Sequence, residues 1–277
     1  MGRCSYCGKD AGFLRSAHGE CKKKHEAAAQ SLIAMASQAI IGGDDPTAVD
    51  APIHKTALSG WVQDAELQQL LVSAWETAVE QLLTAGILTA DKETVLTRFA
   101  GHYQLARPDL DVHGAYSRVV KAAVLRDLLE GKIPTRVKFV GTLPFLFQKG
   151  ESLVWVFTDT GLFQYKTSRQ YVGRNSGFSV RVAKGVYYHI GGFKGHSVEQ
   201  TNLVPAGYGT FAVTSRNIYF GGTGKSFRIP YSKMISIEPY DDGVGITRDT
   251  ASAKEQVFVT GDGWFTFNLI KNLASIE

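Results

Sequence analysis

The feature that most constrains the fold is a change in hydrophobic period near residue 135. Between residues 26 and 131, apolar residues recur three and four positions apart, which is the spacing of one face of a helix. Between residues 136 and 277, short β-branched or aromatic runs are separated by Gly, Asn, Asp or Pro, as in antiparallel sheets. One long fibre or coiled coil is therefore excluded, and we expect an α+β multidomain protein.

Turn signals divide the chain into three predicted parts. Residues 41–46 read Ile-Gly-Gly-Asp-Asp-Pro and residues 131–134 read Gly-Lys-Ile-Pro, and both sequences stop a helix and begin a turn. We predict a zinc finger with its helix over residues 1–41, a helical bundle over residues 47–131 and a β domain over residues 136–277.

The helical bundle is predicted from apolar stripes and their caps. Apolar residues between Leu67 and Leu83 form one stripe of a helix, and that stripe must be buried. Thr89 and Asp111 precede two further stretches with helical spacing, so each could cap a helix. Three packed helices would satisfy this pattern.

The β domain is predicted to be an antiparallel meander closed by one helix. Its last stretch places Phe265, Leu269, Ile270 and Leu273 on one helical face. A sheet of roughly seven strands with one closing helix is the plan of the pleckstrin-homology (PH) superfold, a PH-like β-barrel. The short runs with strand character are residues 153–157, 186–190, 211–214, 217–220, 226–229, 234–237, 244–247 and 256–259.

The sharpest signal for chemistry is a set of Cys and His residues near the N-terminus. Cys4 and Cys7 belong to a Cys-x-x-Cys-Gly turn, which lets two thiolates converge on one ion. His18 and Cys21 lie three residues apart at a predicted helix start, so they share a helix face and can complete a tetrahedron, as in a treble-clef-like finger. The predicted Zn²⁺ ligands are Cys4, Cys7, His18 and Cys21. His25 is an alternate fourth ligand, because it follows Cys21 by one helical turn.

The predicted zinc site is expected to be structural rather than catalytic or redox-active. Four protein ligands leave no open position at the metal. A redox Cys pair normally follows a strand in a βαβ unit, and no such unit follows Cys7. Three cysteines make no closed disulfide framework, and no apolar run reaches the roughly 20 residues of a membrane span. We expect a soluble protein of the reducing cytoplasm.

A second candidate site consists of basic residues in the β domain. Residues 136–277 hold 16 Lys+Arg and 10 Asp+Glu, a charge of +6, whereas residues 1–135 hold 14 and 16, a charge of −2. Basic groups on loops rich in Gly could bind phosphate headgroups. The alternative is the solvated face of a strand, because no run of consecutive basic residues occurs there. The candidate anion- or lipid-binding residues are Lys166, Arg169, Arg174, Arg181, Lys184 and Lys194.

No catalytic constellation is recognised, so we expect neither an enzyme nor a small-molecule substrate. Residues 221–226 (Gly-Gly-Thr-Gly-Lys-Ser) lack the context of a phosphate-binding loop, because a strand rather than a helix is predicted after them. Residues 191–195 (Gly-Gly-Phe-Lys-Gly) are predicted to form a turn with a basic tip, since no βαβ unit surrounds them.

Three segments of the C-terminal half carry a family resemblance. They are residues 207–220 (Gly-Tyr-Gly-Thr-Phe-Ala-Val-Thr-Ser-Arg-Asn-Ile-Tyr-Phe), 225–231 (Lys-Ser-Phe-Arg-Ile-Pro-Tyr) and 235–238 (Ile-Ser-Ile-Glu). These segments resemble the bacterial PH-like and GRAM-like domains, and the whole chain is similar to a bacterial and phage family that joins an N-terminal zinc finger, a helical spacer and such a domain. The resemblance implies a non-enzymatic binding or scaffold module, and it transfers no ligand.

The sequence therefore predicts a zinc-containing interaction or scaffold protein. We expect it to bind a protein partner or a second copy of itself, with contact to an anionic membrane at the inner face as a variant. The alternative is a nucleic-acid-binding protein that uses the finger and basic surface residues such as Lys22–Lys24, although one finger gives little specificity.

Overall fold

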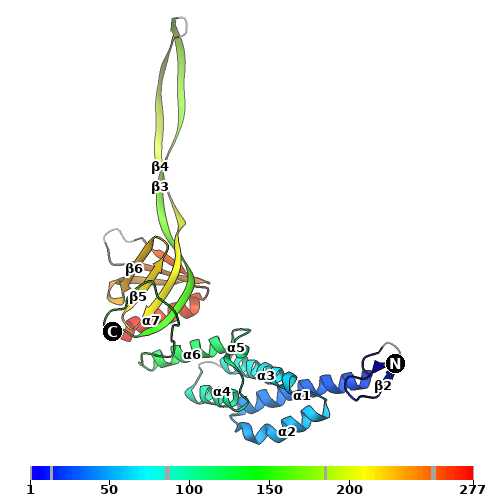
Figure 1. The fold of residues 1–277 in the computed structure, drawn as a ribbon. Helices are drawn as coiled ribbons and strands as arrows, with labels where there is room; N and C mark the ends of the chain where they lie inside the picture. The colour runs from blue at the N-terminus through cyan, green and yellow to red at the C-terminus, as the bar shows by residue number, and fades with distance from the viewer. Residues whose placement is uncertain (1, 13–14, 85–87, 184–185, 251–253, 277) are drawn as a thin grey trace. The chain divides into compact units, whose positions relative to one another are not determined.

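The computed structural model of the chain forms two compact units, Met1–Pro134 and Thr135–Glu277, and each is described by itself (Figure 1). The residues that the structure describes are 2–12, 15–84, 88–183, 186–250 and 254–276, and the side chains of residues 168–200 lie outside this description.

The first unit is helical apart from two short strands at its start. Strand β1 (Gly2–Arg3) pairs antiparallel with β2 (Asp10–Gly12). The helices that follow are α1 (Gly19–Gly42), α2 (Pro46–Ser59), α3 (Asp64–Thr84), α4 (Ala90–His102), α5 (Arg107–Leu110) and α6 (Ala115–Leu129).

Local sequence explains where several of these helices begin and end. Asp45 is the N-cap of α2, and its carboxylate accepts a hydrogen bond from the N–H of Thr47. Thr89 caps α4 by accepting from the N–H of Lys92, as the sequence predicted. Helix α1 is followed by its C-cap Gly43, whose φ of 77° lies in the left-handed region that glycine adopts without steric cost.

The predicted cap at Asp111 differs from the structure. The N-cap of α6 is Gly114, with a φ of 72°, and the short helix α5 comes before it. Asp111 nevertheless accepts hydrogen bonds from the N–H of Ser117 at 2.7 Å and from its hydroxyl at 2.8 Å. Asp111 therefore satisfies a free N–H group in the first turn of α6 from outside the cap position.

Helices α1 to α4 contribute to one shared apolar core. The predicted stripe of α3 is buried there, and the indole N–H of Trp75 donates to the carbonyl of Leu96 at 3.0 Å. Leu32 and Ile40 of α1 belong to the same core. The helix that follows the predicted finger thus packs into the predicted bundle, within one compact unit.

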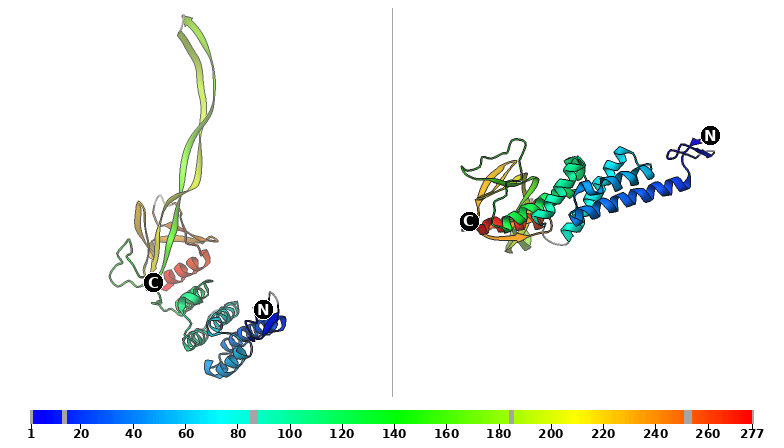
Figure 2. Two further views of the ribbon diagram at one scale, coloured as in Figure 1. Left: turned by 45° about the vertical axis from the view of Figure 1, so that its right-hand side comes forward. Right: turned by 90° about the horizontal axis from the view of Figure 1, so that it is seen from below.

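The second unit is a curled antiparallel sheet with one C-terminal helix. The elements are β3 (Leu153–Ala183), β4 (Val186–Thr214), β5 (Asn217–Gly222), β6 (Lys225–Pro230), the 3₁₀ turn η1 (Tyr231–Lys233), β7 (Met234–Pro239), β8 (Gly243–Arg248), β9 (Gln256–Val259) and α7 (Gly263–Ile276). The strands pair in the order β6-β5-β4-β3-β9-β8-β7. The sheet that they form curls into a half-barrel (Figure 2).

Aromatic rings fill the core of the half-barrel. Phe258 lies with its ring centroid 4.8 Å from that of Phe211 and 5.9 Å from that of Phe220. Helix α7 adds Phe265, which packs edge-on against Trp155 at 4.8 Å. The four residues predicted on the apolar face of α7 are all buried: Phe265, Leu269, Ile270 and Leu273.

The structure corrects the strands predicted between residues 153 and 214. Segments 186–190 and 211–214, predicted as separate strands, belong to the single strand β4, which pairs with β3 along a hairpin that extends beyond the other strands (Figure 1). The predicted turn at residues 191–195 is also part of β4, where Gly191 and Gly195 face Gly177 and Gly173 of β3. Glycine weakens a strand because it has no side chain to pack. It still has the backbone N–H and C=O groups that form the hydrogen bonds between strands, so paired glycines can continue the sheet.

Candidate metal centre

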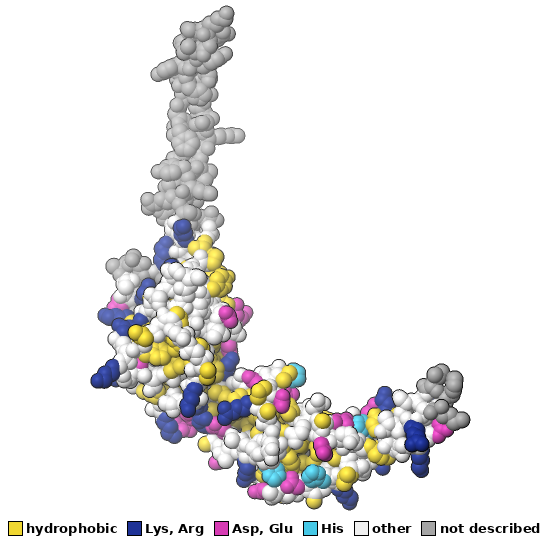
Figure 3. Space-filling model, in the orientation of Figure 1, with side chains coloured by type: hydrophobic (Ala, Val, Ile, Leu, Met, Phe, Trp, Pro, Cys, Tyr) yellow, Lys and Arg dark blue, Asp and Glu magenta, His cyan; other side chains and the backbone are white. Residues whose placement is uncertain are grey.

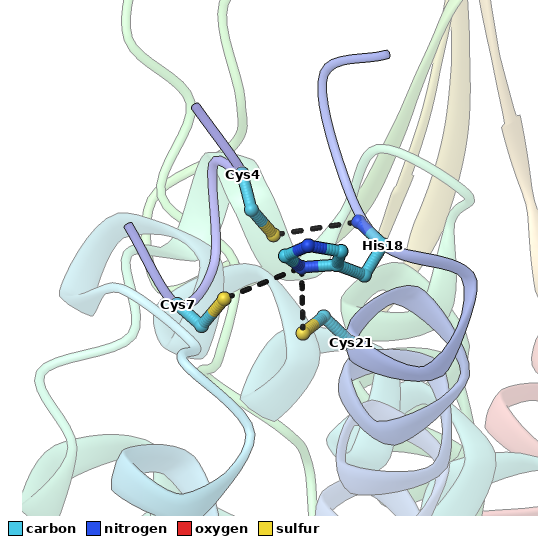
Figure 4. A group of neighbouring side chains, drawn as sticks. All are labelled: Cys4, Cys7, His18 and Cys21. Atoms are coloured by element: carbon cyan, nitrogen blue, oxygen red, sulfur yellow. Dashed lines mark hydrogen bonds between the residues drawn. The ribbon is translucent and has the colours of Figure 1, made fainter. Parts of the chain in front are cut away.

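The structure brings three cysteines and one histidine together in the first unit. The ligand atoms of Cys4, Cys7, His18 and Cys21 all lie within 4.8 Å of one another (Figure 4). Nδ1 of His18 is 3.4 Å from Sγ of Cys7 and 3.7 Å from Sγ of Cys21. Around a tetrahedral zinc ion, sulfur and nitrogen ligands lie about 3.6 Å apart, as follows from the usual bond lengths. The cluster could therefore hold a metal ion, and its atoms and spacing are consistent with zinc.

The backbone of the Cys-x-x-Cys turn explains the position of the first two cysteines. The N–H of Cys4 donates to the carbonyl of Lys9 at 2.8 Å, and the N–H of Gly8 donates back to the carbonyl of Cys4 at 2.9 Å. Gly8 has a φ of 71°, which an L-residue adopts at a steric cost. This tight turn between β1 and β2 directs the sulfurs of Cys4 and Cys7 toward the same point.

The second pair of residues comes from the start of α1. His18 is the N-cap of this helix with extended backbone angles, and Cys21 follows in its first turn. The N–H of Ser5 donates to the carbonyl of Ser16 at 2.8 Å, which ties the Cys-x-x-Cys turn to the segment before the helix. The turn and the helix start therefore meet at the cluster.

The ring orientation of His18 favours metal binding through Nδ1. Nε2 of His18 lies 2.8 Å from the carbonyl oxygen of Asp10 in β2, so it donates its proton there. That hydrogen bond raises the pKa of His18, together with hydrogen bonds to Cys7 and Cys4. In the neutral ring, Nδ1 then carries a lone pair directed toward Cys7 and Cys21. Metal-binding histidines usually make such a hydrogen bond with the other ring nitrogen.

The local environment lowers the pKa of the Cys4 thiol and raises the pKa of the Cys21 thiol. Cys4 is buried, with 2% of its surface exposed. Burial raises the pKa of the Cys4 thiol, but hydrogen bonds from the backbone at Cys7, His18 and Tyr6 outweigh burial and lower it to about 6. Burial and the neighbouring sulfurs of Cys7 and Cys4 raise the pKa of Cys21 to about 11. Cys4 thus loses its proton at a lower pH than Cys21, and Cys21 must release a proton when it binds a metal.

His25, the alternate ligand, is bonded elsewhere. Its Nδ1 lies 2.8 Å from the carbonyl oxygen of Gly60, and its Nε2 lies 2.8 Å from Oε1 of Glu66. The sequence spacing allowed either His18 or His25, and the cluster contains His18. Neither partner of His25 could be found from the sequence, because both follow it by more than 30 residues.

The candidate anion-binding residues are only partly described. Lys166 of β3 is exposed. The backbones of Arg169, Arg174 and Arg181 belong to β3 and that of Lys194 to β4, where Arg174 and Lys194 are direct partners, but their side chains lie outside the described residues. Lys184 lies outside them altogether.

The described surface of the second unit carries basic side chains beyond the candidate set. Over the face of the second unit shown in Figure 3, Lys and Arg side chains are dispersed among apolar and acidic ones. None of the described helices is both long and apolar enough to span a bilayer.

Comparison of the chain with models of protein families, with curated proteins and with solved structures finds no match in any of the three. We therefore infer the function from the fold and from the geometry of the site.

Proposed function

We propose that the chain is a non-enzymatic, zinc-containing interaction protein, in which a structural zinc ion holds the N-terminal finger and a PH-like domain binds protein partners or a second copy of the chain. The observation that carries the proposal is the closed group of Cys4, Cys7, His18 and Cys21, with the His18 ring held by the carbonyl of Asp10. A donor set of three sulfurs and one nitrogen is typical of structural zinc sites.

The small size of the finger supports a structural role for the metal. Its strands β1 and β2 contain two and three residues, and the only buried side chains they and their turn provide are those of Cys4 and Ala11. So little apolar surface cannot offset the entropy of ordering the chain. Metal binding would supply the missing folding free energy.

The assignment of a PH-like domain rests on strand arrangement and on the closing helix. Seven antiparallel strands curl into a half-barrel, and α7 packs its apolar face into the core. This arrangement supports the resemblance to PH-like and GRAM-like domains seen in the sequence. Because PH-like folds serve many functions, the surface and not the fold must indicate the partner.

Exposed apolar side chains on this unit support a protein partner. Ile235 lies on β7, an edge strand of the sheet, and Trp264 lies at the start of α7, and both side chains are largely exposed. An edge strand offers unpaired backbone groups to a partner strand. Contact through apolar surface would also resist salt, since burial of apolar area is not screened.

The nucleic-acid alternative loses support at the run Lys22–Lys24. Nζ of Lys22 lies 3.8 Å from Oε1 of Glu26, and Nζ of Lys23 lies 3.8 Å from Oε1 of Glu20. The ammonium of Lys24 lies over the ring of Trp61, 4.9 Å from its centroid. Each lysine of the run is thus next to an acidic or aromatic group of the chain itself, as on an ordinary solvated helix face.

A binding survey tests the proposed function. We expect the full chain to self-associate at both about 50 mM and about 500 mM salt, because screening does not weaken apolar contacts. Sedimentation with vesicles rich in phosphatidylserine should leave the protein in the supernatant. Ile235→Asp should weaken self-association, whereas Leu146→Asp, an exposed position outside the sheet, should not. Salt-sensitive vesicle binding by a monomer that Arg174→Glu abolishes would replace the proposal with membrane recruitment.

The pH dependence of zinc binding gives a second test. Zinc competes with protons at Cys4, whose pKa is about 6, and at Cys21, whose pKa is about 11. Apparent affinity should therefore rise with pH, about tenfold per unit for each proton released, and rise more steeply below pH 6 than above it. Competition with a chelator between pH 5 and pH 8 measures the slope, and an affinity that does not change with pH would contradict thiolate ligation.

A further inference from the structure

A cluster of side chains joins the Cys-x-x-Cys turn to the helices of the first unit. Tyr6 lies between Cys4 and Cys7 in the sequence, and its ring packs against that of His25 with centroids 4.7 Å apart and planes inclined by 35°. The ring of Trp61 is the next neighbour of Tyr6, at 6.1 Å. The turn that carries two candidate ligands therefore contacts both α1 and the α2–α3 connection.

His25 is the centre of this cluster, which we call the clasp: Tyr6, His25, Gly60, Trp61 and Glu66. Only 13% of the His25 side chain is exposed. Its two ring nitrogens face the carbonyl oxygen of Gly60 and the carboxylate of Glu66, each at 2.8 Å. Both partner atoms are oxygens that can accept a hydrogen bond, so the ring is held between two acceptors.

Gly60 of the clasp also packs tightly against α1. A Cβ atom added to Gly60 would clash with Cβ of Ala28 in α1, so there is no room for a side chain at this point. Gly60 ends α2, and Glu66 lies in the first turn of α3. The His25 ring of α1 thus connects the Cys-x-x-Cys turn, through Tyr6, with the end of α2 and the start of α3. The tight packing at Gly60 leaves little room for these segments to move.

From this arrangement we propose that the clasp couples metal binding to the stability of helices α2 and α3. This inference rests on the proposed zinc site. Zinc fixes Cys4 and Cys7 and with them the ring of Tyr6, which covers one face of His25. Without zinc the turn loses its order, Tyr6 leaves His25, and water competes for the hydrogen bonds to Gly60 and Glu66. Coupling of binding is reciprocal, so a loosened clasp also weakens zinc binding.

Hydrogen exchange of the full chain, read by mass spectrometry, measures this coupling. We expect removal of zinc by a chelator to speed amide exchange in α2 and α3 by about tenfold in the natural sequence. In His25→Ala the same removal should change exchange by less than about twofold, although the protein still binds one zinc ion. His113→Ala is the matched control, because His113 bonds Glu76 of α3 away from the clasp and should retain the full difference.

Tyr6 variants test the clasp without replacing His25. Tyr6→Phe keeps the ring and should keep the coupling, whereas Tyr6→Ala should lose it even if His25→Ala fails to fold. The inference is overturned if zinc removal speeds amide exchange in α2 and α3 equally in the natural sequence, in His25→Ala and in Tyr6→Ala. It is also overturned if the natural sequence binds zinc and its removal does not change that exchange. A chain that binds no zinc would contradict the metal site itself, and metal analysis of each sample separates that failure from a failure of the clasp.

Discussion

Replacing Cys7 with Ser is expected to weaken zinc binding by more than about 100-fold, and metal analysis of purified protein should find less than about a tenth of an equivalent per chain. Sγ of Cys7 lies 3.4 Å from Nδ1 of His18, and a serine hydroxyl is a poor zinc ligand. Because the finger has little core of its own, exchange of amides over residues 2–12 should become as fast as in an unfolded chain.

Matched histidine variants separate ligation from general damage. His18→Ala should lose zinc as Cys7→Ser does, since His18 is in the cluster. His25→Ala should retain one equivalent, because its nitrogens bond Gly60 and Glu66. Ser5→Ala, an exposed position inside the Cys-x-x-Cys turn, should retain zinc as well. Zinc retained by His18→Ala and lost by His25→Ala would reverse the assignment of the fourth ligand.

The second large effect is expected in the core of the half-barrel, where Phe258→Ala should destabilise the second unit by about 3–5 kcal/mol. Phe258 is completely buried, and the rings of Phe211, Phe220 and Phe227 lie within 6.3 Å of it. Removing its ring leaves a cavity that a curled sheet cannot close by a small shift. Denaturant unfolding of the full chain, followed by near-ultraviolet circular dichroism, measures the loss.

Trp264→Ala provides the matched control for this core substitution. Trp264 is also aromatic, but 68% of it is exposed, so its removal should change stability by no more than about 0.5 kcal/mol. A similar loss of stability in Phe258→Ala and Trp264→Ala would mean that Trp264 is buried, which would contradict the assigned exposed side of α7.

Features that depend on neighbouring residues in the chain were predictable from the sequence. The buried stripe of α3, the cap at Thr89 and the apolar face of α7 follow from helical spacing and local hydrogen bonding. The metal cluster was predictable for the same reason, because a turn and a helix start each deliver two ligands within four residues.

Features that depend on distant residues were not predictable. The choice of His18 over His25 follows from the carbonyl groups of Asp10 and Gly60, and a backbone carbonyl has no signature in the sequence. The length of β3 and β4 was missed because glycine within a strand and glycine in a turn look alike in the sequence. The pairing of β3 with β9, which brings Leu162 opposite Phe258, spans nearly 100 residues and depends on the whole sheet.

A zinc ion in the first unit is expected to have three sulfur ligands and one imidazole nitrogen ligand. X-ray absorption spectroscopy of the zinc-loaded full chain tests this directly, because sulfur and nitrogen ligands differ in distance from the metal. The structure predicts about three sulfur atoms at about 2.3 Å and one nitrogen atom at about 2.0 Å. A shell with two nitrogen atoms and two sulfur atoms, or one made mainly of oxygen, would contradict it.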